Sequence, residues 1–395
     1  MPGQDFLAAN EDFLDGNETQ IYPALALARA TSPIPSSPGV GRDARPRRNL
    51  TRWDDIDWVL RNPELFSSRP ALDDIPHTGS KVMIGLDGDE HRRYRSLVSR
   101  AFSPAALRPL ERDLVEPLIR GLLRAVRGRG RGRAELIGDV IRRFPVQVIC
   151  HMLGVPVDQM DDFQRWGTDM ILGAFDDDAA AKAAAAMTAV LEPIVADRRR
   201  APRDDLISQL VSAELDGARL DDEGLYSFLR LLLPAGADTT WRAFGSVMVA
   251  LLAEPDLLAE VTANRSLVPQ IIEETLRWET PSPRQVRMAN TDIEIGGLPI
   301  EAGTILEVWT GSANHDESRF DDPEQWRPGR DRSHIAFGAG PHICIGINLA
   351  RMELRLGVNA LLDELPGLRL DPAKPAPVIS GHALRGPNEI HVLFD

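Results

Sequence analysis

Apolar residues recur at three- and four-residue spacing along most of this chain, and this period limits the fold more than any other feature of the sequence. Between residues 91 and 126 the apolar positions include Leu107, Leu110, Leu114 and Leu118, the spacing that gives a helix one buried face. The chain is therefore expected to be mainly helical. The same spacing predicts further helices at residues 134–153, 181–199, 205–215, 222–253, 267–278 and 346–364.

The signals for β-strands are short. The pair Gly296-Gly297 predicts a hairpin turn, because glycine tolerates the backbone angles of a two-residue hairpin loop. Residues 311–341 are rich in Asn, Asp, Pro, Gly and Arg and lack periodicity, so we expect an ordered coil there. Strands are expected at residues 292–295, 304–309 and 389–394.

The organisation of the chain favours one domain. Length alone allows two or three domains in 395 residues. However, the sequence contains no internal repeat and no Pro-, Gly- or Ser-rich linker. We therefore expect a single domain over residues 1–395 that is mainly α with small β-sheets (α+β). The acidic residues 1–20 are expected to form a poorly ordered N-terminal segment.

Composition narrows the class of protein. The net charge of −14 argues against binding to nucleic acid, whose phosphates need clustered cations. The one basic tract, at residues 127–133, is interpreted as a solvated loop. The N-terminus lacks the pattern of a signal peptide, and the longest apolar run, near residues 243–253, is shorter than the ~20 residues of a membrane span. Two cysteines exclude a disulfide framework and fit a reduced, cytoplasmic compartment.

Several common catalytic motifs are absent from the sequence. The segment from Gly338 resembles a dinucleotide-binding loop at first, but the pattern needs glycine at position 343, which is Ile343, and no βαβ pattern surrounds it. The sequence also lacks the phosphate-binding loop, the zinc-protease motif and the nucleophile elbow of hydrolases.

Cys344 lies in the segment FGAGPHICIG, residues 337–346, directly before a predicted helix. Gly338 and Gly340 permit a tight turn, and Gly346 would let a flat cofactor approach the backbone. Free N–H groups at the helix start would lower the pKa of the thiol. A thiolate in this setting has the features of an axial haem ligand. A lone cysteine is more often a small buried hydrophobe, and we keep that interpretation for Cys150.

The cysteine segment resembles the haem-binding loop of the cytochrome P450 family, F-G-x-G-x-H-x-C-x-G. Three further segments match the family in the same order: H-x-x-x-R at 91–95, A-G-x-D-T-T at 235–240 and E-x-x-R at 274–277. The matches cover about residues 50 to 395 and resemble the soluble bacterial members. The resemblance implies the single-domain P450 fold, with haem b between the long oxygen-binding helix and the helix after the cysteine loop.

The resemblance also implies how haem is held. Cys344 is the expected iron ligand. Haem propionates need cationic partners when partly buried. For His91 and Arg95 the alternative is a surface pair near Asp89 and Glu90. The residues expected to meet the propionates are His91, Arg95, Arg287 and His342. Those expected to contact the rest of the cofactor are Ala235, Phe337, Gly338 and Gly346.

Asp238 and Thr239 interrupt an apolar helix pattern, which requires a reason. Pro234 removes a helical hydrogen bond, so we expect a kink near Ala235. By resemblance, Thr239 donates a hydrogen bond in the oxygen-binding site and Asp238 relays protons. A structural ion pair is the alternative for Asp238, and Thr240 is expected to be structural.

Glu274 and Arg277 are three residues apart and share one helical turn. By resemblance they form a buried charge cluster with an arginine from the loop before the cysteine, for which Arg330 is the candidate. This cluster is expected to support the fold and haem incorporation rather than the chemistry.

The resemblance implies a monooxygenase that inserts one atom of O2 into a mainly apolar small molecule, by hydroxylation or epoxidation. Two electrons are expected from a ferredoxin and its flavoprotein reductase, and the enzyme is expected to be a monomer. Two alternatives stay open, a peroxide-driven peroxygenase and a haem-thiolate sensor without enzymatic activity. A basic surface for the ferredoxin is expected at Arg327, Arg330, Arg332 and Arg351.

Substrate contacts are expected from the loop 72–86, the oxygen-binding helix, the segment 281–286 and the turn 380–385. The apolar residues of the first loop suggest an apolar ligand with some polar anchors. Arg284 either anchors an acidic substrate or lies behind the pocket wall or at the surface. The candidate pocket residues are Ile84, Leu231, Ala235, Ser282 and Ala383.

Overall fold

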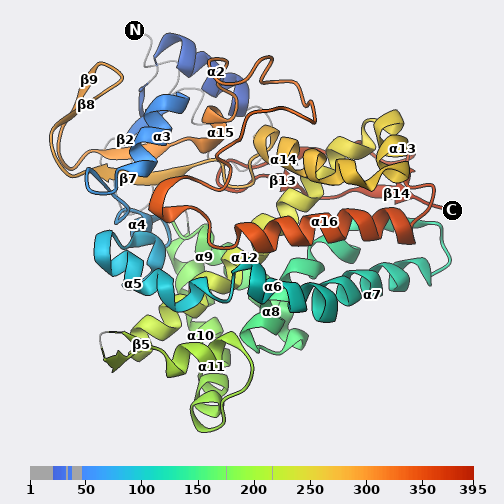
Figure 1. Ribbon diagram of the computed structural model, residues 1–395, viewed down its shortest axis with the longest axis horizontal. Helices are drawn as coiled ribbons and strands as arrows, with labels where there is room; N and C mark the ends of the chain where they lie inside the picture. Colours follow the sequence, from blue (N-terminus) through green and yellow to red (C-terminus); the bar gives the residue numbers. More distant parts are fainter. Residues whose placement is uncertain (1–20, 33, 38–46, 175, 216) are drawn as a thin grey trace.

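The computed structural model describes residues 21–32, 34–37, 47–174, 176–215 and 217–395. The expected poorly ordered segment 1–20 lies outside these residues. The described part is mainly helical, with small sheets at its edges (Figure 1). This agrees with the α+β class expected from the sequence.

The helices follow the apolar periodicity closely. The expected helical stretch 91–126 is divided into three helices and a π-helical segment, η3 (Glu111–Val115). Pro104 begins the second of these helices, and Ser103 caps it through a hydrogen bond from the Ala106 N–H. The helices are α2 (Ile21–Thr31), α3 (Trp53–Arg61), α4 (Ala71–Asp74), α5 (Gly88–Ser99), α6 (Pro104–Leu110), α7 (Glu116–Arg127), α8 (Arg143–Leu153), α9 (Met160–Ile171), α10 (Asp177–Arg200), α11 (Leu206–Ser212), α12 (Asp222–Leu252), α13 (Pro255–Ala263), α14 (Val268–Trp278), α15 (Thr310–Ala313) and α16 (Ile347–Glu364).

The largest sheet has the strand order β1-β2-β10-β7-β3, and four smaller sheets flank the helices. The expected hairpin is confirmed, since Gly296 and Gly297 have φ values of 55° and 82° and join β8 to β9. The strands are β1 (Ser36–Ser37), β2 (Arg47–Leu50), β3 (Phe66–Ser67), β4 (Arg133–Glu135), β5 (Glu214–Leu215), β6 (Ala218–Arg219), β7 (Gln285–Ala289), β8 (Ile293–Ile295), β9 (Leu298–Ile300), β10 (Ile305–Val308), β11 (Arg369–Leu370), β12 (Ile379–Ser380), β13 (Gly386–Pro387) and β14 (His391–Leu393).

Two expected helices start or end differently. The stretch 134–153 begins as β4, because residues 133–135 pair with β14 near the C-terminus. The stretch 205–215 ends as a helix at Ser212 and continues into the hairpin β5–β6. The basic tract 127–133 is also more than a solvated loop. Its Arg129 pairs with Asp139, and its last residue lies in β4.

The helix α12 forms the centre of the core. Most of its residues are buried, and it packs against α8, α9, α14 and α16. Figure 1 shows α16 running along α7, with α14 on its other side. This arrangement brings the loop before α16, which carries Cys344, toward the middle of α12. The candidate site therefore lies between these two helices.

One described helix, α10, is long and apolar enough to cross a membrane by length and composition. A third of its apolar window is buried in the fold, where α10 packs against α9. Many of its apolar positions are alanines, and charged residues occupy both ends.

Candidate active site

The loop before α16 presents Cys344 to a large cavity. Gly338 and Gly340 have φ values of 73° and 67°, so the expected glycine turn is present. A side chain at Gly340 would collide with the carbonyl oxygen of Leu60. The Cys344 N–H donates to the Phe337 carbonyl over 2.9 Å, which closes the turn. The Cys344 side chain is exposed, and it forms part of the lining of the cavity.

The pKa of the Cys344 thiol differs from the sequence-based expectation. Burial raises the pKa above its usual value, although the Gly346 N–H and the Arg95 charge lower it. The expected lowering by the helix start is therefore outweighed in the protein alone, because desolvation disfavours the charged form. A coordinated metal ion deprotonates a thiol outright, so the thiolate depends on the bound iron.

Four cationic or hydrogen-bonding side chains gather on one wall of the same cavity: His91, Arg95, Arg287 and His342. The rings of His91 and His342 are stacked with their centroids 3.9 Å apart. Arg95 donates to the carbonyl oxygen of Ile343 over 2.6 Å. The structure thus brings together residues from α5, β7 and the cysteine loop.

Two observations show that this wall lacks an anion. Nε2 of His91 is buried and has no hydrogen-bond partner among the described residues. Arg287 is 5% exposed, and its hydrogen bonds go to its neighbours Val286 and Gln285. Burial lowers the pKa of Arg287 to about 10, with only the charge of Asp87 opposing this effect. A buried cation without an ion pair is costly, and the two propionates of a haem would supply the missing charge.

The surface alternative for His91 and Arg95 does not agree with the structure. His91 is 2% exposed, and Asp89 pairs with Arg92 instead. The thiol, the cationic wall and Gly346 beside the sulfur together fit haem, with Cys344 as the iron ligand.

The helix α12 also lines the cavity, through residues that include Ala235 and Thr239. The Thr239 hydroxyl donates to the Ala235 carbonyl over 3.2 Å. A hydrogen bond from a threonine hydroxyl to the carbonyl four residues earlier bends helices locally. The helix continues through Pro234 without interruption, and a kink near Ala235 stays a prediction. Gly236 allows α8 to pack closely, because a Cβ there would lie 2.9 Å from Ile149.

Asp238 lies just outside the cavity lining and is 2% exposed. Its carboxylate accepts a hydrogen bond from the Trp241 indole over 2.7 Å and one from the Thr168 hydroxyl over 3.4 Å. Arg242 lies 3.9 Å from the same carboxylate and stacks on Trp241. The contacts with Trp241 and Thr168 were not expected from the sequence, whereas Arg242 provides the ion pair that was the alternative for Asp238. Thr168 belongs to α9, whose last residue lines the cavity, so the carboxylate is linked to the cavity wall.

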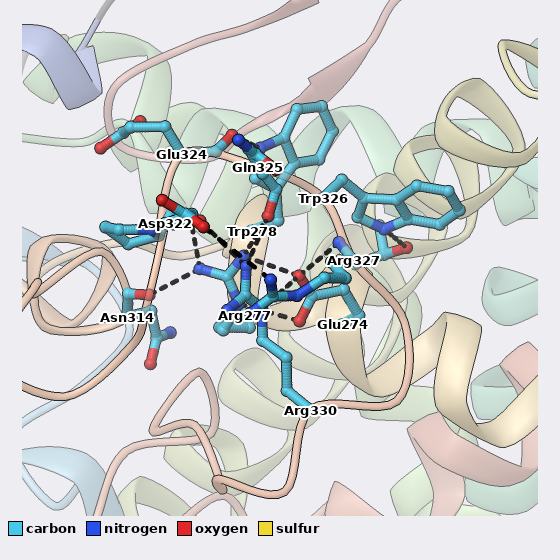
Figure 2. Close-up of polar contacts among 12 residues, drawn as sticks. Glu274, Arg277, Trp278, Asn314, Asp322, Glu324, Gln325, Trp326, Arg327 and Arg330 are labelled. Carbon is cyan, nitrogen blue, oxygen red and sulfur yellow. Dashed lines mark hydrogen bonds and ion pairs between the residues drawn. The ribbon is translucent and has the colours of Figure 1, made fainter.

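Glu274, Arg277 and Arg330 form one buried cluster, as Figure 2 shows. Two hydrogen bonds of 2.7 and 2.9 Å join Arg277 to Glu274, and Arg330 reaches the same carboxylate over 3.0 Å. Arg277 also donates to the carbonyl oxygens of Asn314, Pro323 and Gln325. The cluster therefore ties α14 to the coil before the cysteine loop.

Comparison with known proteins identifies the family. Residues 145–366 match the model of the Cytochrome P450 family. This chain belongs to the cytochrome P450 family. It is 34% identical over 383 residues to the methyl-branched lipid omega-hydroxylase of Mycobacterium tuberculosis, covering 92% of this chain and 87% of the relative. It is 33% identical to the steroid C26-monooxygenase of Mycolicibacterium smegmatis, over 97% and 94% of the two chains.

The fold gives the same assignment. Cytochrome P450 CYP109Q5 from Chondromyces apiculatus superposes with a TM-score of 0.84 and 32% identity, covering 95% of both chains. This P450 is therefore a monooxygenase with haem b as its cofactor.

All five candidate pocket residues of the P450 line the cavity: Ile84, Leu231, Ala235, Ser282 and Ala383. The four expected segments also border it. Ile171 and Ala174, at the end of α9, line it as well and were not expected. No motif marks this segment, and only its packing on α12 brings it to the cavity.

The expected basic surface needs one correction. The Arg330 side chain is 7% exposed and is engaged by Glu274, so it cannot meet a partner protein. Arg351 is half-exposed and pairs with Glu273 over 2.6 Å. His334 also contacts Glu273. Together, Arg351 and His334 lower the pKa of Glu273 to about 2, although burial acts to raise it. Arg332 is exposed.

Proposed function

We propose that this P450 hydroxylates or epoxidises a mainly apolar small molecule with electrons from an external ferredoxin and reductase. This proposal rests mainly on one observation: Cys344 and Thr239 line the same cavity, whose lining is largely apolar. Two relatives support an apolar substrate, because one is named as a lipid hydroxylase and the other as a steroid monooxygenase. We also propose that the enzyme acts as a soluble, cytoplasmic monomer.

Haem, when bound, supplies the iron at which O2 is activated. The chain's own part is to bind the substrate, exclude water and deliver protons. Thr239 is proposed to donate its hydroxyl proton into the oxygen-binding site. Asp238 is proposed to take up a proton from solvent and pass it to this hydroxyl, once its carboxylate leaves Trp241. This acid–alcohol pair favours O2 chemistry over a peroxide-driven reaction, and it has no use in a sensor.

Thr239→Ala is expected to keep haem while uncoupling electron use from oxygenation. General acid catalysis contributes at least about 100-fold to many reactions, so product formed per NADH consumed should fall at least about tenfold. The lost electrons should be recovered as hydrogen peroxide, measured alongside product. Thr239→Ser keeps the hydroxyl and is the control. Unchanged coupling in Thr239→Ala would remove the threonine from proton delivery.

Arg332 is proposed to contribute to the surface that binds the ferredoxin, together with Arg327 and Arg351. Arg332→Glu should slow reduction by the ferredoxin several-fold at low salt, because charges at an interface rim mainly set the association rate. Substrate affinity should not change. The control is Arg200→Glu, since Arg200 is exposed at the end of α10, away from the cysteine loop (Figure 1). Equal reduction rates for the two variants would contradict the proposal.

A further inference from the structure

A cluster of four charged side chains borders the substrate cavity, and the mechanism above does not use it. Arg47 and Glu307 come from neighbouring strands β2 and β10, Arg284 precedes β7, and Asp74 ends α4. Arg284 and Asp74 line the cavity. Such a cluster is unexpected in an otherwise apolar wall, because buried charges are costly unless each is paired.

Glu307 is the well-paired member of the cluster. Its two carboxylate oxygens accept hydrogen bonds from Arg47 and Arg284, each over 2.5 Å. Burial opposes ionisation of Glu307, but these two arginines hold its pKa below the usual value. Glu307 therefore stays charged and fixes both guanidinium groups.

Asp74 and Arg284 are incompletely paired. The Oδ2 atom of Asp74 lies 3.7 Å from Nη2 of Arg284, beyond hydrogen-bond distance. The other oxygen of Asp74 is held by Arg47 at 3.4 to 3.5 Å, which are long contacts. Arg284 donates its hydrogen bond to Glu307 through Nη1 and not through Nη2. One donor of Arg284 and one acceptor of Asp74 thus lie side by side at the cavity, without a hydrogen bond between them.

The net charge of the cluster limits which chemical group of a substrate can bind to Arg284 and Asp74. Two arginines and two ionised carboxylates sum to zero; burial raises the pKa of Asp74, and the charges of Arg284 and Arg47 oppose this effect. His382 adds no charge because burial and the Arg284 charge lower its pKa to about 4. A carboxylate would leave the site at −1 and an ammonium at +1, each buried without a counter-charge. A hydroxyl both accepts and donates, so it can accept from Arg284 and donate to Asp74 without changing the charge.

We propose that Arg284 and Asp74 form a binding site for a neutral hydroxyl group of the substrate, which makes this P450 selective for apolar alcohols. This inference rests on the proposed function, because it names the substrate class of that same cavity. An acidic substrate does not fit at Arg284, since Glu307 and Asp74 together already balance the charges of Arg284 and Arg47.

The test compares four ligands with one chain length: decanol, decanoate, decylamine and decane. Dissociation constants are measured by calorimetry on the haem-loaded protein, with the spin-state shift of haem as a second readout. Decanol should bind at least about tenfold more tightly than each of the others. Calorimetry reports affinity without turnover, so the inference can fail while the enzyme still oxygenates substrates.

Variants that change the net charge of the cluster test whether this charge determines which ligand binds. Asp74→Asn changes the cluster to +1, and decanoate should gain about tenfold relative to decanol. Arg284→Gln changes it to −1, and decylamine should gain instead. The matched control is Asp73→Asn, because Asp73 is the preceding residue of α4 and is absent from the cavity lining. It should leave the order of affinities unchanged. Equal binding of the four ligands by the native protein, or the same order in both charge variants, would overturn the proposal.

Discussion

Cys344→Ala is expected to abolish the strongly red-shifted Soret band that the reduced protein gives with carbon monoxide. This band requires thiolate coordination of the iron, and Cys344 carries the thiol that lines the cavity. Oxygenation should be lost with the band, because the electron density that a thiolate supplies favours cleavage of the O–O bond. The measurement is the difference spectrum of the reduced protein, normalised to its haem content.

The second cysteine provides the control for this experiment. Cys150 is fully buried in α8, and burial raises the pKa of its thiol to about 12. It cannot replace Cys344 as a ligand, so Cys150→Ala should keep the red-shifted band. A red-shifted band in haem-loaded Cys344→Ala would refute the assignment of the ligand.

The periodicity of the sequence predicted most of the helices, because a buried helical face leaves a repeating apolar pattern. It did not predict β4 or the helices α2, α3, α4, α9, α13 and α15. The residues of β4 form a strand only because β14, more than 250 positions later, offers unpaired backbone groups. The helix α3 has nine residues, too few for a pattern of several turns. These elements depend on partners that are distant in sequence.

In the candidate site, too, local features were predictable from the sequence and contacts between distant residues were not. Local chemistry was predictable for Cys344, since the glycine turn and the following helix lie within ten residues. The Thr168 contact of Asp238 was not, because Thr168 lies 70 positions away. The cluster of Arg47 and Glu307 spans 260 positions. A single sequence identifies charged residues but not which of them meet.

Glu274→Gln is expected to cost about 3–5 kcal/mol of stability, the usual effect of breaking a buried ion pair. The Glu274 side chain is 3% exposed, and its one carboxylate pairs with two arginines, Arg277 and Arg330. Glutamine has nearly the same shape, but it leaves both cations buried without a counter-charge. Since a folded protein is stable by only about 5–15 kcal/mol, little haem-loaded protein should accumulate. Urea unfolding and the ratio of haem to protein measure the loss.

The neighbouring residue offers a matched control for this loss. Glu273 also accepts hydrogen bonds from an arginine, Arg351, but their side chains are 39% and 41% exposed. Water screens the pair with Arg351, and only the contact with His334 involves a buried partner, so Glu273→Gln should cost clearly less than Glu274→Gln. The same substitution at adjacent positions of α14 thus separates burial from the mere presence of an ion pair. Equal losses for the two variants would contradict the structural role of the Glu274 cluster, and a smaller loss at Glu274 would contradict its burial.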